Sequence, residues 1–92
     1  MVRYHWKITG LVQGVFYRKS FQERALCLGV VGTVMNCADG SVEAVVEAEK
    51  DVLEELNRWA QSGPPMASVE DVHVIKSEEI NQASFTTFSI IR

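Results

Sequence analysis

The stretch Gly10-Leu-Val-Gln-Gly-Val-Phe-Tyr-Arg18 decides how the fold begins, because it joins an alternating segment to a helical one. Its two glycines, four residues apart, allow positive φ angles, so successive backbone N–H groups can turn toward one concave site. Arg18 adds a planar guanidinium that stays charged and whose fork matches two phosphate oxygens. The pattern predicts an anion-binding loop, although such a loop followed by arginine is by itself more often an ordinary strand-to-helix turn.

The segments on either side of this loop have opposite periodicities. From Val2 to Thr9 apolar and polar side chains alternate, which predicts a half-buried strand. From Phe21 to Leu28 apolar side chains recur at helical spacing, and Gly29 stands where a helix commonly ends. We therefore expect a helix of about three turns that starts near Lys19.

The rest of the chain predicts further strands and a second helix. Asp39-Gly40 has hairpin-turn chemistry, and Gly63-Pro64-Pro65 prevents a helix from continuing. We expect strands over 30–36, 41–48, 69–76 and 85–91, a helix around 52–60, and a polar loop over 77–84. The order βαββαβ, with one extra turn or short strand near the end, predicts an α+β, ferredoxin-like sandwich in which two helices cover one face of an antiparallel sheet.

This topology predicts where two polar side chains meet. A helix of about ten residues carries the chain roughly 15 Å from the loop, and a strand of about seven residues brings it back over roughly 23 Å. If strand 30–36 lies parallel beside strand 2–9, Asn36 reaches the level of Arg18, at the strand ends where ligands usually bind. Asn36 stands three residues before Asp39-Gly40, however, and asparagine in such a place is frequently only a turn former.

Composition limits the function further. A chain of 92 residues with 47% hydrophobic and 23% charged residues predicts a single domain over 1–92. The net charge of -3 argues against nucleic-acid binding, and Val42 to Ala48 has no aromatic residue on which RNA bases could stack. The first twenty residues show no signal peptide or membrane span, so we expect a cytoplasmic protein.

The cysteines and histidines indicate no metal or redox centre. Cys27 and Cys37 form no CxxC motif, and we expect two buried or half-buried free thiols. The loop after the first strand lacks the cysteines that a copper or zinc carrier needs. We expect His5 and His73 to be solvent-facing or structural. No metal and no cofactor is predicted.

The quoted motifs resemble those of the acylphosphatase family. Gly10 to Arg18 is similar to that family's first signature, and Gly32-Thr-Val-Met-Asn36-Cys-Ala-Asp-Gly40 to its second, at the same spacing. The resemblance implies a ferredoxin-like fold and metal-free hydrolysis of acyl phosphates to a carboxylate and orthophosphate. It also implies that Arg18 binds the phosphate and that Asn36 positions the attacking water. Phosphate binding is expected from the loop residues Gln13, Gly14, Val15, Phe16, Tyr17 and Arg18.

Two positions depart from the family's pattern. Phe21 stands where many relatives have threonine or serine, and Cys37 replaces the small hydroxyl residue that often follows the asparagine. Neither is expected to carry the chemistry, but both bear on the hydrogen bonds that support Asn36. Because the chain ends with the domain, we expect a free-standing enzyme rather than part of a larger maturation protein.

The residue types near the loop favour direct attack by water. No cysteine, DxD pair or histidine near the loop could serve as a nucleophile, and an asparagine amide can orient water but cannot accept its proton. The simplest proton acceptor is a phosphate oxygen of the substrate, which is our hypothesis, and a protein carboxylate is the alternative base. The leaving carboxylate, with a conjugate-acid pKa of roughly 4, needs no general acid at neutral pH. No carboxylate cluster stands near the loop to bind magnesium.

One alternative function stays open at this stage. A non-catalytic ferredoxin-like module that binds a small anionic ligand would leave no sharp mark in the sequence. We expect a small-molecule acyl phosphate as the partner, no nucleic acid, no membrane, and a monomer. Nothing in the sequence identifies residues that bind the acyl end.

Overall fold

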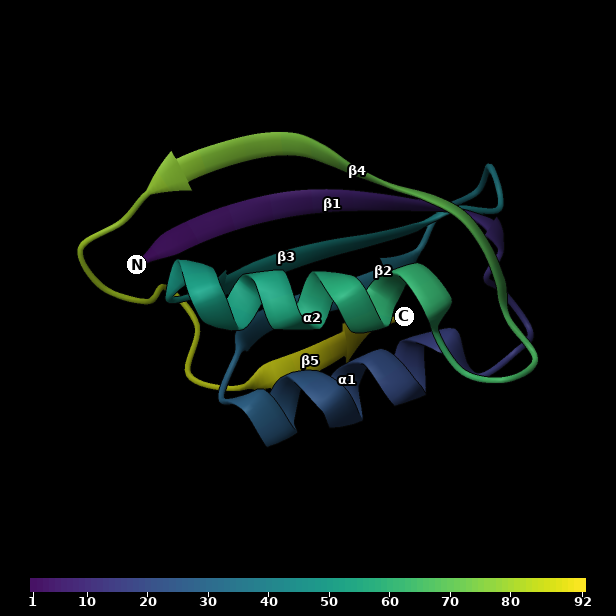
Figure 1. The fold of residues 1–92 in the computed structure, drawn as a ribbon, viewed down its shortest axis with the longest axis horizontal. Coiled ribbons are helices and arrows are strands. Elements are labelled where there is room, and N and C mark those ends of the chain that lie inside the picture. Colours follow the sequence, from purple (N-terminus) through teal and green to yellow (C-terminus); the bar gives the residue numbers. More distant parts are fainter.

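The computed structural model describes residues 1–92, and its elements follow the predicted order with one short strand at the end. The elements are β1 (Val2–Leu11), α1 (Tyr17–Leu28), β2 (Val31–Asn36), β3 (Val42–Ala48), α2 (Lys50–Ser62), β4 (Ser68–Glu79) and β5 (Phe88–Ile91). Figure 1 shows one sheet with both helices on the same face, which confirms the ferredoxin-like arrangement. Neither helix has the length and apolar character needed to cross a membrane.

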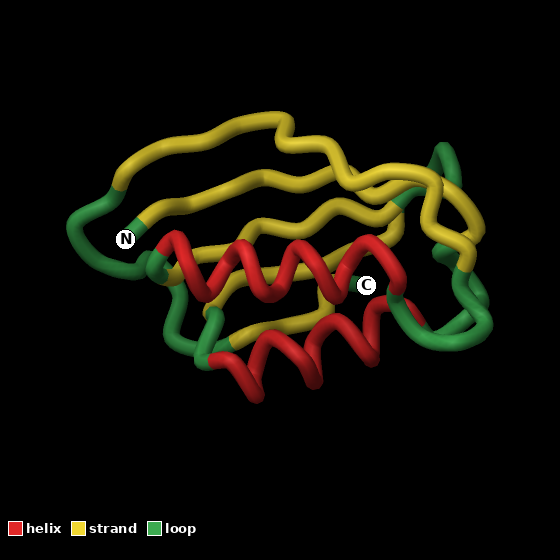
Figure 2. The backbone as a smooth tube through the Cα atoms, in the orientation of Figure 1, coloured by secondary structure: helices red, strands yellow, loops and turns green.

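The sheet is mixed, which corrects the prediction of an antiparallel one. Its strand order is β4-β1-β3-β2-β5, and every neighbouring pair is antiparallel except β2 and β5, which are parallel. The last strand can pair in parallel because the long connection from β4 crosses to the far edge of the sheet before β5 begins (Figure 2).

The expected direct pairing of β1 with β2 is also wrong, because β3 lies between them. The short turn after β2 pairs β3 with β2 at once, and the other side of β3 then pairs with β1. Both β1 and β2 are antiparallel to β3, so they still run in the same direction. Their carboxyl ends therefore reach the same edge of the sheet, as predicted.

Each helix packs one apolar side against the sheet. The side chains that the helices bury are Tyr17, Phe21, Ala25, Leu53, Leu56 and Ala60. They recur at intervals of three or four residues, as on one side of a helix. α1 ends at Gly29, whose φ of 75° is left-handed, and α2 ends at Gly63 before two prolines. The core continues in the sheet with the buried side chains of Trp6, Ile8, Val34, Val42, Val46 and Phe88.

The last two strands differ in length from the prediction. β4 runs to Glu79, so 77–79 belongs to a strand and not to the predicted loop, while β5 begins only at Phe88. Polar residues can extend β4 because it is an edge strand whose side chains are largely exposed. Glu78 is opposite Arg3 of β1, and the two form an ion pair of 3.2 Å between Nη1 and Oε1.

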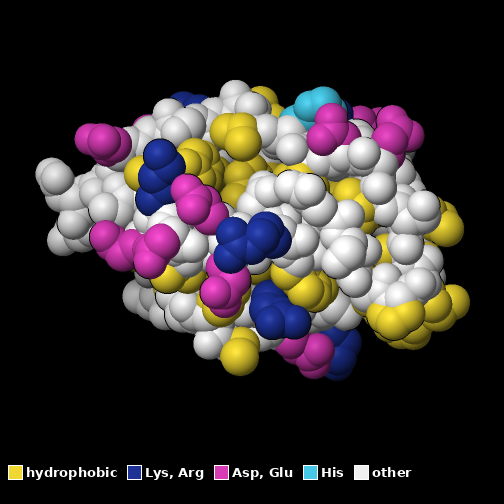
Figure 3. All heavy atoms as spheres, in the orientation of Figure 1, with side chains coloured by type: hydrophobic (Ala, Val, Ile, Leu, Met, Phe, Trp, Pro, Cys, Tyr) yellow, Lys and Arg dark blue, Asp and Glu magenta, His cyan; other side chains and the backbone are white.

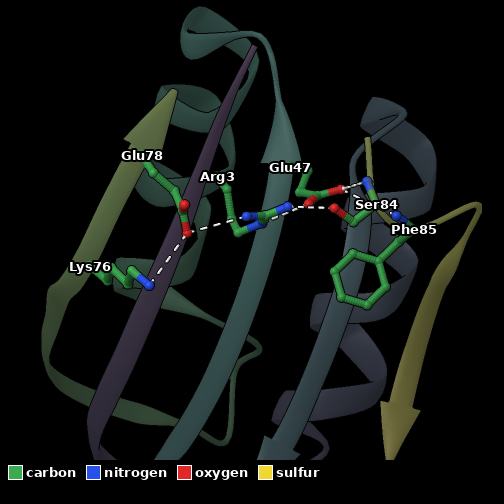
Figure 4. Close-up of polar contacts among 6 residues, drawn as sticks. All are labelled: Arg3, Glu47, Lys76, Glu78, Ser84 and Phe85. Atoms are coloured by element: carbon green, nitrogen blue, oxygen red, sulfur yellow. Dashed lines mark hydrogen bonds and ion pairs between the residues drawn. The ribbon is translucent and has the colours of Figure 1, made fainter. Parts of the chain in front are cut away.

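A buried carboxylate fastens the connection between β4 and β5 to the open face of the sheet. Glu47 of β3 is fully buried and accepts a hydrogen bond of 2.7 Å from Arg3 Nε. Its other oxygen accepts bonds from the backbone N–H groups of Ser84 and Phe85, at 2.7 and 3.3 Å. Figure 4 shows this network joining β1, β3 and β4 to the connection. These bonds therefore fix the middle of the connection that brings β5 beside β2.

Candidate active site

The carboxyl ends of β1 and β2 and the amino end of α1 surround one pocket of about 400 Å³. Arg18 and Asn36 both line it, so the fold brings together the two side chains that the sequence paired. The other residues around the pocket are Val12, Gly14, Phe16, Tyr17, Lys19, Gln22, Ile90 and Arg92.

The loop at the pocket has a series of free backbone donors. From Val12 to Lys19, no backbone N–H donates a hydrogen bond to another group of the protein; the first that does belongs to Ser20, bonded to Phe16 O at 3.1 Å. The first N–H groups of a helix have no partner inside it, and the partial positive charge there favours anions. The loop and the first turn of α1 together therefore offer donors to an anion.

Two residues with left-handed backbone shape this loop. Gly14 has a φ of 74°, and Phe16, the N-cap of α1, has a φ of 65°. Left-handed backbone is costly for a residue with a side chain, and Phe16 offers no side-chain cap to the helix. Helix α1 consequently begins at Tyr17, two residues earlier than expected, and Arg18 lies in its first turn rather than in the loop.

Gly10 has a different role from the one predicted. It lies within β1, at a register shift in the pairing with β4, and its φ is 116°. A Cβ at this position would lie 2.3 Å from Ser68 O and 2.6 Å from Glu70 N. Gly10 is therefore needed for the close approach of two strands, and it does not line the pocket.

Gln13 joins the loop to the hairpin that carries Asn36. Its Nε2 donates hydrogen bonds of 2.8 Å to Cys37 O and of 2.8 Å to Ser41 O. Gln13 does not line the pocket, and neither does Val15, whose side chain is buried in the core. For these two residues, phosphate binding through the backbone N–H stays a prediction.

Tyr17, which lines the pocket, also anchors the first turn of α1 to α2. Its hydroxyl donates a hydrogen bond of 2.7 Å to Ala60 O of α2, and its ring lies 5.8 Å from that of Trp59. Burial raises the pKa of Tyr17 well above its usual value, so the phenol stays protonated and keeps this bond. The backbone of the neighbouring Arg18 is therefore held in a fixed position.

Asn36 is the last residue of β2 and is exposed at the pocket. The turn after it is closed by a hydrogen bond of 2.8 Å from Cys37 N to Ser41 O. Asp39 accepts hydrogen bonds from the N–H and hydroxyl of Ser41 and pairs with Lys7 Nζ at 2.8 Å. The Lys7 ammonium and these bonds lower the pKa of Asp39. The turn is thus built by Asp39, which leaves the Asn36 side chain without a hydrogen bond inside the protein.

The pocket is positively charged although the chain has a net charge of -3. Arg18, Lys19 and Arg92 line it, no acidic side chain does, and none of the three forms an ion pair. Sequence reasoning missed Lys19, although it directly follows Arg18. It also missed Arg92, for which there was no signal, because only the parallel pairing of Met35 with Ile91 brings the end of β5 beside the pocket.

No Cys, Ser, Thr, His, Asp or Glu side chain that could act as a covalent nucleophile lines the pocket. His73 is exposed on β4, His5 is half-buried on β1, and neither reaches the pocket. Both cysteines are free thiols, but Cys27 is exposed, which corrects the expectation of a buried or half-buried side chain. Cys37 is half-buried and its Sγ donates to Glu43 Oε2 at 2.9 Å. The chain has no cluster of three or more His, Cys, Asp or Glu side chains that could hold a metal ion.

Comparison with known proteins adds to this geometry. The sequence profile of the Acylphosphatase family matches residues 4–90. The chain belongs to the acylphosphatase family. It is 45% identical over 92 residues to the acylphosphatase of Pyrobaculum aerophilum, which covers 99% of this chain and 95% of that protein. It is 49% identical over 74 residues to the acylphosphatase of Trichormus variabilis, or 80% of this chain and 73% of that protein.

The fold agrees with that of solved acylphosphatases. The crystal structure of the acylphosphatase from Bacillus subtilis matches with a TM-score of 0.93 and 29% identity, and the match covers all of both chains (100% and 100%). The membership predicted from the two signatures is therefore confirmed.

Proposed function

We propose that this chain is an acylphosphatase that hydrolyses the carboxyl–phosphate bond of small acyl phosphates to a carboxylate and orthophosphate. The observation that carries the proposal is the pocket that Arg18 and Asn36 both line, together with the free N–H groups of its lining residues Val12, Gly14, Phe16, Tyr17, Arg18 and Lys19. Donors that surround three phosphate oxygens match the charge that spreads over them in the transition state of phosphoryl transfer.

The proposed mechanism divides the work between two side chains. Arg18 binds the phosphoryl group through its guanidinium fork, together with the backbone N–H groups at the start of α1. Asn36 holds a water by hydrogen bonds, in line with the bond that breaks. The water attacks phosphorus, its proton passes to a phosphate oxygen, and the electron pair of the broken P–O bond leaves with the carboxylate. A carboxylate is a good leaving group, so no general acid is required.

The test is hydrolysis of acetyl phosphate by the purified protein in excess chelator. We expect turnover that chelation does not reduce and that orthophosphate inhibits competitively. Arg18→Lys keeps the charge but loses the fork, so we expect kcat/KM to fall by about 30- to 1000-fold, or about 2–4 kcal/mol. Arg24→Lys, on the same helix outside this pocket, is the matched control and should be unaffected.

Asn36→Ala separates the two roles. It should retain phosphate affinity and lose kcat by on the order of a hundredfold, because the water is no longer oriented. Asn81→Ala, in the connection before β5, is the control. If Asn36→Ala has normal kcat and a lowered melting temperature, Asn36 only shapes the turn and takes no part in catalysis. Saturable phosphate binding without any turnover of the wild-type protein would instead favour the non-catalytic module. A monomeric state and a cytoplasmic location stay predictions from the sequence.

A further inference from the structure

A second pocket, of about 350 Å³, lies on the helix-covered face between α2 and strands β1 and β4. It shares no residue with the phosphate pocket. Its apolar part is formed by Tyr4, Trp6, Leu53 and Val74, and Val74 remains 54% exposed. Figure 3, which looks onto the helices, shows apolar side chains uncovered in a hollow between α2 and β4, with charged side chains nearby.

The pocket has an unusual polar group beneath it. Trp6 is only 1% exposed, yet its indole N–H is the one buried side-chain polar atom of the protein without a hydrogen-bond partner. Buried polar groups are nearly always paired, so a lone one calls for an explanation. Because this N–H has almost no accessible surface, an acceptor seated in the pocket would reach it only after the side chains around Trp6 shift.

The side of the pocket formed by α2 carries one charge of each sign. Glu54 and Arg58 stand one helical turn apart, and neither forms an ion pair with the other or with any other residue. Between them, Asn57 accepts a hydrogen bond of 2.6 Å from Gln61 on its Oδ1, which leaves its amide N–H groups free to donate. Opposite charges on one helix face at this spacing often pair. Here both remain available to a ligand.

We propose that this pocket binds a free α-amino acid with an apolar side chain. The free donors of Asn57 and Arg58 fit a carboxylate, and the Glu54 carboxylate fits an ammonium group. The apolar side chain of the ligand would lie against Leu53 and Val74. Because the two formal charges cancel, the site complements a zwitterion better than a phosphate ester or another polyanion. This inference does not depend on the proposed hydrolysis.

The test is titration of the full chain with L-leucine, L-methionine and L-phenylalanine, followed by two-dimensional NMR and by tryptophan fluorescence. Orthophosphate at saturating concentration keeps the phosphate pocket filled throughout. For ligands of about ten heavy atoms we expect Kd between about 10 µM and 1 mM, with the largest shifts at the indole N–H of Trp6 and around Asn57. The N-acetyl and methyl-ester derivatives should bind at least tenfold more weakly, since each lacks one charge.

Exposed substitutions test the two charged contacts without loss of the fold. Glu54→Gln and Arg58→Gln should each weaken binding at least tenfold, whereas Glu55→Gln and Lys50→Gln, on the same helix outside the pocket, should not. The absence of binding at 20 mM amino acid would overturn the proposal. Equal binding of the derivatives, unchanged binding by both charge variants, or tighter binding of adenosine or AMP would overturn it too.

Discussion

We expect that replacing Gln13 by alanine lowers kcat, although the Gln13 side chain does not line the phosphate pocket. Its side-chain amide spans from the phosphate loop to the hairpin, with bonds of 2.8 Å each to Cys37 O and Ser41 O. Asn36 belongs to this hairpin and directly precedes its turn. Gln13→Ala removes both donors, so the hairpin and the loop lose their direct polar link.

The magnitude follows from the two bonds. A neutral hydrogen bond contributes about 0.5–1.5 kcal/mol net, so the free energy of unfolding should fall by about 1–3 kcal/mol. For a domain of this size that corresponds to a decrease in Tm of roughly 5–20 °C. A displacement of Asn36 by about 1 Å would lower kcat on the order of a hundredfold. Phosphate affinity should change less, because the first turn of α1, which carries Arg18, is held against α2 by the hydrogen bond of Tyr17.

The assay combines kcat for acetyl phosphate, the inhibition constant of orthophosphate, and Tm, all on one preparation below its melting range. Gln61→Ala is the matched control, since it removes an amide that donates one bond, of 2.6 Å, on an exposed helix face away from the phosphate pocket. Wild-type kcat in folded Gln13→Ala would refute the reasoning, because the hairpin would then hold its position without these two bonds. A loss of phosphate affinity as large as the loss of kcat would place Gln13 in phosphate binding instead.

Three further predictions concern stability and reactivity. Gly32→Ala should prevent β2 from pairing normally, because a Cβ there would lie 1.8 Å from Val45 O. We expect the free energy of unfolding, measured with denaturant, to fall by several kcal/mol, at least as much as the about 1–3 kcal/mol that overpacking a core costs. A fall below 1 kcal/mol would contradict this. Burial acts to raise the pKa of Glu47, but the bonds from Arg3 and two backbone N–H groups outweigh it and lower that pKa. The stability advantage of wild type over Glu47→Gln should therefore be full above about pH 5 and disappear as pH falls through the range below about 4, measured by urea unfolding; a difference independent of pH would count against it. A maleimide should label exposed Cys27 faster than Cys37, whose pKa is raised by burial and by Glu43; equal rates would contradict this.

Local pattern was sufficient for most elements and for the two central side chains. Alternation from Val2 to Thr9, the turn chemistry of Asp39-Gly40 and the helix end at Gly29 depend on neighbours in the sequence, so they could be read without the fold. The signatures around Arg18 and Asn36 were long enough to indicate the family, which the comparisons confirm.

What escaped the sequence depended on contacts between distant segments. Local periodicity says which face of a strand is apolar but not which strand is its neighbour, so the position of β3 between β1 and β2 was missed. The same limit hid Arg92 at the phosphate pocket, which arrives there only through the parallel pairing of β5 with β2.

Individual residues show the same division between local and tertiary causes. The sequence by itself determined that Gly10 and Gly14 have backbone freedom, but only the packing of β4 against β1 decided that Gly10 serves a strand contact and Gly14 the loop. Likewise, an amide at Gln13 could bind phosphate or protein equally well. The tertiary structure decided, because two carbonyl oxygens of the hairpin lie within hydrogen-bonding distance of its Nε2 and take up both of its donors.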